Sequence, residues 1–111
     1  MKISKLISEL NLKLVAGESG IENDFNGAYV SDLLSDVMGK AQNNQVWITL
    51  QTHKNIMAIA SLKDLSAIIL VQGLKPDADT IEKSNEDGIP ILICDLPTFE
   101  IAGKIYNMLN S

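Results

Sequence analysis

Apolar residues along this chain alternate between two spacings, one typical of β-strands and the other of α-helices. Continuous apolar runs at 46–50, 67–71 and 90–94 predict strands, and the first of them is rich in β-branched and aromatic residues. An unbroken run such as 67–71 is typical of a strand that is buried on both faces of a sheet. With the shorter apolar segments 12–15 and 28–30, the chain offers about five strands.

Between these runs, apolar residues recur every three or four positions, as they do on one face of a helix. Ser31 is predicted to cap the second helix, with Asp32 in its first turn. Asp95 or Thr98 would cap the last helix, and Gly88 would end the helix before it. The predicted helices cover 3–10, a segment from Ser31 to Ala41, 56–62, 77–87 and a final segment that ends at Leu109.

Two of these helices should differ in how much apolar side-chain surface they bury against the core. The helix at 77–87 has only Ile81 as a large apolar residue, so it should lie mostly in solvent. The final helix carries an apolar face that should pack on the core. This face comprises Ile101, Ala102, Ile105, Tyr106 and Leu109.

Strands that alternate with helices over short links imply a three-layer α/β/α fold with a mostly parallel sheet. A chain of 111 residues has room for one hydrophobic core, so we expect a single domain over 1–111. A domain of this size buries only somewhat more than roughly 60% of its unfolded surface, and self-association would stabilise it further. We therefore expect a homodimer.

The charge of the chain argues against a nucleic-acid partner. Its formal net charge is −5, and every basic residue is a lysine. Phosphate backbones are bound by clustered basic side chains, and arginine supplies the bidentate contacts. No apolar run approaches the roughly 18–20 residues that span a bilayer. With no signal-peptide core in the first residues, we expect a cytoplasmic protein that does not bind membranes.

Five segments of the chain, in the same order, resemble the DRTGG domain family. They are 29–38 (YVSDLLSDVM), 47–53 (WITLQTH), 58–65 (AIASLKDL), 67–73 (AIILVQG) and 89–92 (IPIL). The resemblance covers nearly the whole chain after residue 12. Where the threonine-glycine-glycine segment of the family's name would fall, this chain has Val71-Gln72-Gly73 and keeps only the last glycine.

The resemblance implies a fold like that of the N-terminal domain of HPr kinase/phosphorylase, which some muramyl ligase N-terminal domains share. Related domains lie between paired CBS domains of regulated pyrophosphatases and beside phosphotransacetylase catalytic domains, where they are accessory and help to form dimers. Stand-alone copies often carry a serine kinase label, and some lie among iron-hydrogenase genes, which implies a link to redox metabolism. This chain has no Gly-x-x-x-x-Gly-Lys-Ser/Thr phosphate loop, so we expect no kinase activity.

Parallel sheets bind ligands beyond the C-terminal ends of their strands. The predicted ends carry Ala16-Gly17, Ser31-Asp32, Thr52-His53, Gln72-Gly73 and Cys94-Asp95. Helices that follow such ends offer free backbone N–H groups to an anion. For Ser31 and Asp32 helix capping alone is the simpler interpretation, and we favour it. The candidate ligand-binding residues are Ser31, Asp32, Thr52, His53, Gly73 and Asp95.

Catalytic chemistry would have to use His53, the only histidine, with Cys94, the only cysteine. Their spacing fits no hydrolase signature, and Cys94 ends an apolar strand, where a cysteine is usually a small buried hydrophobe. One histidine, one cysteine and scattered carboxylates do not form a metal-ligand pattern. Trp47 should belong to the core rather than stack on a ligand.

We therefore expect a non-catalytic regulatory or protein-interaction domain that acts through a partner protein and needs no cofactor or metal. A sensor of a nucleotide or similar anion at the strand ends is the alternative. An enzyme that uses His53 and Cys94 is the third hypothesis.

Overall fold

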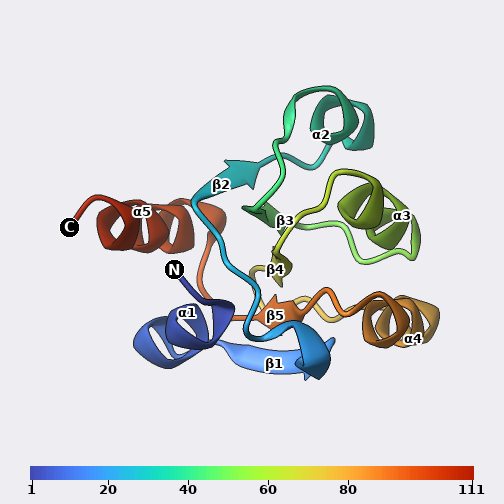
Figure 1. Cartoon of the computed structure of the whole chain (residues 1–111), viewed down its shortest axis with the longest axis horizontal. Coiled ribbons are helices and arrows are strands. Elements are labelled where there is room, and N and C mark those ends of the chain that lie inside the picture. Colours follow the sequence, from blue (N-terminus) through green and yellow to red (C-terminus); the bar gives the residue numbers. More distant parts are fainter.

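The computed structural model describes all 111 residues and shows one sheet with helices on both faces (Figure 1). Every predicted apolar run forms a strand and every predicted apolar stripe forms a helix, which confirms the three-layer α/β/α fold. The strands are β1 (Lys13–Ala16), β2 (Gly27–Val30), β3 (Gln45–Thr49), β4 (Ala67–Leu70) and β5 (Ile91–Ile93). The helices are α1 (Ile3–Leu10), α2 (Leu34–Lys40), α3 (Asn55–Leu62), α4 (Ala78–Asp87) and α5 (Thr98–Leu109), with a 3-10 turn at Glu18–Gly20.

The strands lie in the order β1-β5-β4-β3-β2, and the sheet is mixed. Strands β2, β3, β4 and β5 are parallel, whereas β1 pairs antiparallel with β5. Helices connect the parallel strands as crossovers. The chain leads from β1 to β2 at the far edge, so no crossover joins β1 to its neighbour β5 and fixes its direction. The expectation of a mostly parallel sheet is confirmed, with β1 as the exception.

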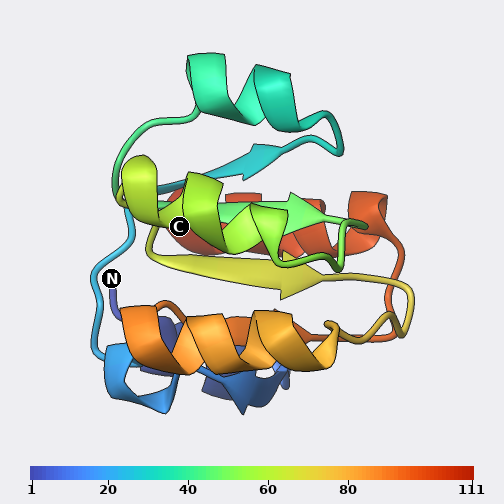
Figure 2. The ribbon, with the colours of Figure 1, turned by 90° about the vertical axis from the view of Figure 1, so that its right-hand side faces the viewer.

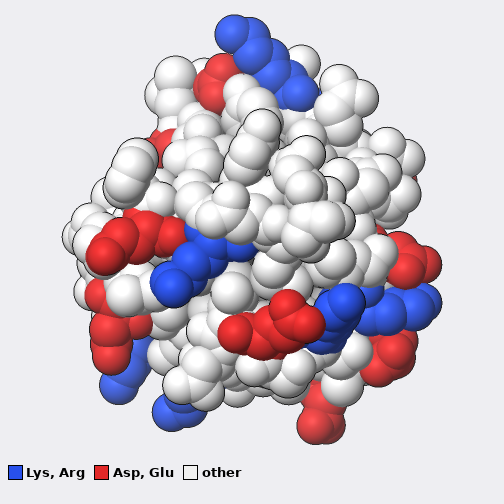
Figure 3. All heavy atoms as spheres, turned by 90° about the vertical axis from the view of Figure 1, so that its left-hand side faces the viewer, with Lys and Arg blue, Asp and Glu red and all other residues white.

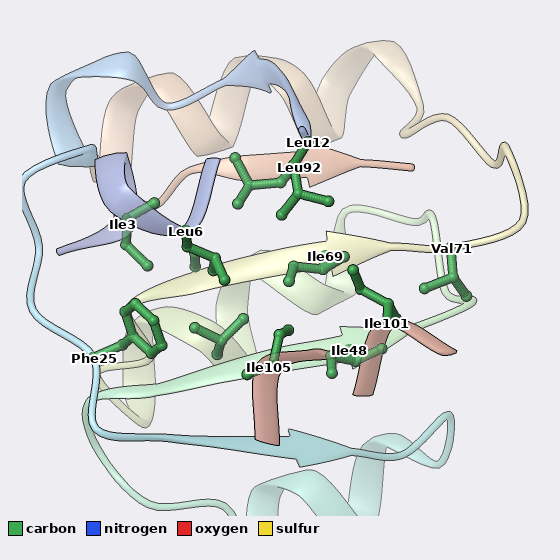
Figure 4. Close-up of a cluster of buried hydrophobic side chains, with 12 residues drawn as sticks. Ile3, Leu6, Leu12, Phe25, Ile48, Ile69, Val71, Leu92, Ile101 and Ile105 are labelled. Carbon is green, nitrogen blue, oxygen red and sulfur yellow. The ribbon is translucent and has the colours of Figure 1, made fainter. Parts of the chain in front are cut away.

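One hydrophobic cluster lies between the sheet and the helices α1 and α5. Figure 4 shows Ile3 and Leu6 of α1 and Ile101 and Ile105 of α5, all fully buried, against the sheet. A fully buried aliphatic side chain contributes about 1.5–3 kcal/mol relative to an exposed one. Both ends of the chain are therefore held to the same face of the sheet.

A second cluster of equal size fills the other face, beneath α2 and α3. Because successive side chains of a strand point to opposite faces, Trp47 lies here while its neighbours Val46 and Ile48 lie in the first cluster. Trp47 is fully buried, and its indole Nε1 donates to the backbone oxygen of Ser31 at 2.8 Å. The prediction that Trp47 is a core residue is confirmed.

Helix α4 packs on the second face through hydroxyl groups. Thr80 and Ser84 are fully buried, and their hydroxyls donate to the backbone oxygens of Thr52 (2.9 Å) and Ile89 (2.6 Å). The other side chains of the helix are exposed or half-buried, as predicted. Gly88 ends the helix with φ 65°, a left-handed conformation that glycine adopts without a steric penalty.

The predicted start of the second helix is wrong. Helix α2 begins at Leu34, with Leu33 at the N-cap position and no side-chain cap. The hydroxyl of Ser31 accepts the N–H of Leu33 at 3.2 Å instead, in a local turn before the helix. Asp32 likewise lies outside the first turn, because its carboxylate is engaged with the end of β3 (below).

The last helix also lacks the predicted side-chain cap. Pro97 occupies the N-cap position of α5, and neither Asp95 nor Thr98 caps it through a side chain. Its buried face is narrower than predicted. Ile101 and Ile105 are fully buried, but Tyr106 is 68% exposed.

Candidate functional site

The C-terminal ends of the four parallel strands lie together, and the predicted site residues lie in the loops that follow them. Figure 2 shows the arrowheads of β2, β3 and β4 pointing the same way, and β5 pairs parallel with β4. Ser31-Asp32 follows β2, Thr52-His53 follows β3, Gln72-Gly73 follows β4, and Cys94-Asp95 follows β5. The prediction that Ala16-Gly17 lies with these loops is wrong. Strand β1 runs antiparallel, so its C-terminal end lies beside the N-terminal ends of the other four strands.

Asp32 holds the loop after β2 to the loop after β3. Its Oδ1 accepts the hydroxyl of Thr49 at 2.9 Å and the N–H of Leu50 at 2.7 Å. Its backbone oxygen accepts the side-chain amide of Gln51 at 2.9 Å. A carboxylate that accepts these two hydrogen bonds has less capacity left for a ligand. Asp32 therefore has a structural role, but it joins two loops and does not cap the helix as predicted.

Asp36, just beyond this loop, is linked to β2. The hydroxyl of Tyr29 donates to Asp36 Oδ2 at 2.7 Å. This hydrogen bond is the main reason why the pKa of Asp36 lies below its ordinary value, with Ser31 contributing next. The same bond raises the pKa of Tyr29, since ionisation of the phenol would place two negative charges together.

The loop after β3 is joined to the start of α4. The backbone oxygen of Thr52 accepts the N–H of Asp77 (3.1 Å) and the hydroxyl of Thr80 (2.9 Å). His53 Nδ1 lies 3.0 Å from Asp77 Oδ2, and the histidine side chain is 72% exposed. His53 is therefore a surface histidine with one carboxylate partner.

The loop after β4 makes a tight left-handed turn. Gln72 and Gly73 both have positive φ, at 58° and 72°. The N–H of Gln72 donates to Leu96 O at 3.0 Å, and the N–H of Gly73 donates to Cys94 O at 2.9 Å. A Cβ at Gly73 would lie 3.2 Å from Asp95 Oδ1, so both the turn and the neighbouring loop favour glycine. The backbone N–H groups of the turn bind the loop after β5 and are not free for an anion.

The two residues of the enzyme hypothesis have separate partners. Cys94 lies in a half-buried position with Sγ 3.9 Å from Leu96 O, and burial raises the pKa of its thiol. His53 has Asp77 as its partner, and no hydrogen bond joins it to Cys94. A nucleophile activated by a base requires such a bond and a low thiol pKa. The geometry gives no support to the enzyme hypothesis.

The hollows of the surface lie away from most of these residues. The largest, of about 420 Å³, opens near the N-terminal ends of the parallel strands and is lined by polar residues such as Asn23, Asp64 and Asp87. Another, of about 390 Å³, includes Cys94 and Asp95 beside α1 and β1. No group of three His, Cys, Asp or Glu side chains could hold a metal ion. The strand ends form a hydrogen-bonded rim rather than a cavity.

An apolar surface that we did not predict lies where α5 meets β2. Phe99 is 88% exposed, Tyr106 68% and Val30 49%. Phe99, Ala102, Tyr106 and Leu109 recur at helical spacing on α5, beside the stripe that is buried. A wholly apolar hollow of about 190 Å³ lies between this stripe and the strand. The residues of this α5–β2 surface are Ala28, Val30, Phe99, Ala102, Tyr106 and Leu109.

The α5–β2 surface is on the same side of the molecule as a broad uncharged area. Figure 3 shows the face that bears α1 and α5, with a broad area free of charged side chains between a few charges at the top and a row of charges lower down. The signal in the sequence was the number of apolar residues in 99–109, which is more than one buried stripe needs. The prediction that Tyr106 belongs to the buried face is wrong.

The comparison with protein families decides the relationship. The profile of the DRTGG domain matches residues 5–108, almost the entire chain. This chain belongs to the DRTGG domain family. The resemblance that the sequence segments indicated is confirmed.

A solved structure shares the fold of this DRTGG domain. It holds the CBS and DRTGG domains of the regulatory region of Clostridium perfringens pyrophosphatase, complexed with the activator diadenosine tetraphosphate. The TM-score is 0.68 at 13% sequence identity, with 92% of this chain and 44% of that chain covered. The DRTGG domain described here thus spans less than half the length of that chain.

No curated protein matches the DRTGG domain described here. The link with redox or hydrogenase metabolism finds no support among the matches.

No helix of the domain combines the length and apolar character that crossing a membrane requires.

Proposed function

We propose that this DRTGG domain is a non-catalytic regulatory domain that acts by association with another protein chain, and that it forms a homodimer through the α5–β2 surface. The observation that carries the proposal is the exposure of Phe99 and Tyr106 on one helix stripe beside an uncharged strand. Isolated exposed apolar residues are common, but a contiguous set rimmed by polar residues usually marks an interaction site. The accessory role of related domains agrees with this proposal.

The size of the surface suits a dimer. An aromatic side chain carries about 150–250 Å² of accessible area, so Phe99 and Tyr106 together expose on the order of 300 Å² at their 88% and 68% exposures. With Val30 the apolar area approaches half of the roughly 800 Å² that each partner buries in a standard interface. Interfaces commonly surround such an apolar centre with a polar rim of similar extent.

A charge placed in the surface tests the proposal. Tyr106→Lys should convert the wild-type dimer into a monomer in sedimentation velocity at concentrations up to about 200 µM. Leu62→Lys is the matched control, because Leu62 is 69% exposed on α3, on the other face of the sheet. This control should remain a dimer. A monomeric wild-type protein, or equal disruption by both variants, would contradict the proposal.

A nucleotide sensor is the second candidate, favoured by the diadenosine tetraphosphate in the related regulatory region. The ligand would lie over the strand ends, near Ser31, Asp32, Thr52, His53, Gly73 and Asp95. Against this site stand its two carboxylates, Asp32 and Asp95, the carboxylate of Asp77 beside His53, and the internal hydrogen bonds described above.

Thermal unfolding with a panel of mononucleotides and dinucleoside polyphosphates tests the sensor. A ligand at about 100 times its Kd stabilises the folded state by about 2.7 kcal/mol, which raises Tm by several degrees. His53→Ala should reduce that shift if the strand ends bind the ligand. An unchanged Tm with every member of the panel would rule out the sensor for these ligands.

A further inference from the structure

The two edges of the sheet differ in their protection against pairing with another strand. Edge strands commonly carry lysine, proline, bulges or covering elements that prevent such pairing. Strand β1 has exposed Lys13 and a register shift between Leu14 and Ala16. Strand β2, Gly27-Ala28-Tyr29-Val30, has no charge, no proline and a regular register with β3. Only β2 is an unprotected edge.

The hydrogen bonds to β3 show which backbone groups of β2 point outward. The N–H of Ser31 donates to Ile48 O at 3.3 Å, so Ser31 faces β3. Backbone groups alternate in direction along a strand at an edge, and Gly27 and Tyr29 therefore face β3 as well. The N–H and C=O groups of Ala28 and Val30 point away from the sheet. No other strand is paired with β2 on this side.

From this geometry we infer that two copies join edge to edge through β2, antiparallel about a two-fold axis at Tyr29. This inference rests on the proposed homodimer and states how it forms. Ala28 of each copy exchanges two backbone hydrogen bonds with Val30 of the other copy, and the two sheets become one. Because the contact uses the same surface twice, it closes at two copies and does not grow into a fibre.

The side chains fit the same arrangement. Ala28 and Val30 both line the apolar hollow with Ala102, Ile105 and Tyr106, so they lie on the α5 face of the sheet. A two-fold axis perpendicular to the sheet places the two α5 helices on the same face, one on each side of the axis. The exposed stripes that carry Phe99 and Tyr106 then cover the strand junction from that face. Figure 1 shows β2 as the last strand, between α5 and α2.

Amide hydrogen exchange of the unmodified protein tests the strand pairing. The amides of Ala28 and Val30 should exchange at least about 10-fold more slowly at a concentration where sedimentation shows a dimer than in a dilute monomeric sample. The amide of Tyr29 already donates within the sheet and serves as the internal reference. A dimer in which the Ala28 and Val30 amides exchange as in the monomer would overturn the inference but leave the proposed function intact. A monomer at every concentration would refute both.

A proline variant provides the second test. Val30→Pro removes an outward N–H and no bond to β3, and edge strands tolerate proline at such positions. Val30→Thr is the control, since it keeps the N–H and the β-branched side chain. The proline variant, checked for folding by circular dichroism, should be a monomer and the threonine variant a dimer. If folded Val30→Pro dimerises with unchanged affinity, the helices alone form the contact and the inference is wrong.

Discussion

The β1 edge and the β2 edge of the sheet are built in opposite ways. At the β1 edge the chain packs tightly: the N–H of Gly17 donates to Asn85 Oδ1 at 2.7 Å, and Gly17 lies directly against the backbone of Ile89 and Pro90. Exposed Lys13 and the register shift between Leu14 and Ala16 oppose pairing with another chain. At the β2 edge there is an exposed valine and an apolar helix stripe.

This difference shows where the domain can bind another protein without loss of its own stability. The close contacts of Gly17 maintain the fold at the β1 edge, whereas at the β2 edge the exposed side chains of Val30 and Tyr106 contribute little that the isolated domain requires. Substitutions at the two edges should therefore separate stability from association. Four predictions test that separation, ordered by the expected effect.

The strongest contrast should come from neighbouring residues of α5. Ile105 is fully buried and Tyr106 is 68% exposed. Ile105→Ala should lower the free energy of unfolding by about 2–5 kcal/mol, because it removes buried methyl groups and leaves a cavity. Tyr106→Ala should change it by less than about 1 kcal/mol but weaken association. Urea unfolding at a concentration where the protein is monomeric measures both. Equal losses of stability would show that Tyr106 supports the fold.

At the β1 edge, Gly17→Ala should destabilise the domain by about 2–3 kcal/mol. Gly17 has φ 76°, and a Cβ there would lie 2.5 Å from Ile89 O, which is backbone and does not yield easily. Gly39→Ala is the control, since its Cβ would have no neighbour within 4 Å on α2. This control should stabilise by about 0.4–1 kcal/mol. Similar Tm values for the two variants would contradict the tight packing of this edge.

At the β2 edge, the Tyr29–Asp36 bond should appear in the pH dependence of stability. The pKa of Asp36 is lowered from 3.8 in the folded protein, so its contribution is present above pH 3.8 and is lost as the pH falls through the lowered value. Tyr29→Phe removes the main cause of the shift. The Tm of this variant should fall less steeply with acid than that of the wild type. Parallel acid profiles for the two proteins would show that the bond does not stabilise the folded state.

The smallest effects on stability, within about 0.5 kcal/mol, are expected from an exchange of edge residues. Val30→Lys should abolish association, because lysine on an edge strand prevents pairing. Lys13→Val should not create association, because the register shift of β1 remains. Sedimentation velocity distinguishes the two outcomes. Larger assemblies of Lys13→Val would mean that the charge of Lys13, rather than the irregular register, protects β1.

Local patterns in the sequence were sufficient for the elements and the fold class. The apolar run 67–71 encodes a strand buried on both faces, and Ile101 and Ile105 encode a buried helix stripe, because burial imposes a spacing on each element by itself. The strand ends were placed correctly wherever a helix crossover fixed the direction, as at Ser31-Asp32 and Gln72-Gly73. Membership of the DRTGG family was also evident from ordered segments of sequence.

Only the tertiary structure decided the features that depend on neighbours distant in the chain. The direction of β1 follows from its pairing with β5, nearly eighty residues later. Because this pairing is antiparallel, Gly17 lies at the N-terminal ends of the parallel strands and not at their C-terminal ends. Asp32 bonds Thr49 and Leu50 rather than capping α2, because those donors are brought to it by the sheet. The exposure of Tyr106 and the outward backbone of Val30 depend on β2 being the last strand. Sequence spacing specifies which residues can share a face, whereas strand order determines which edge remains free.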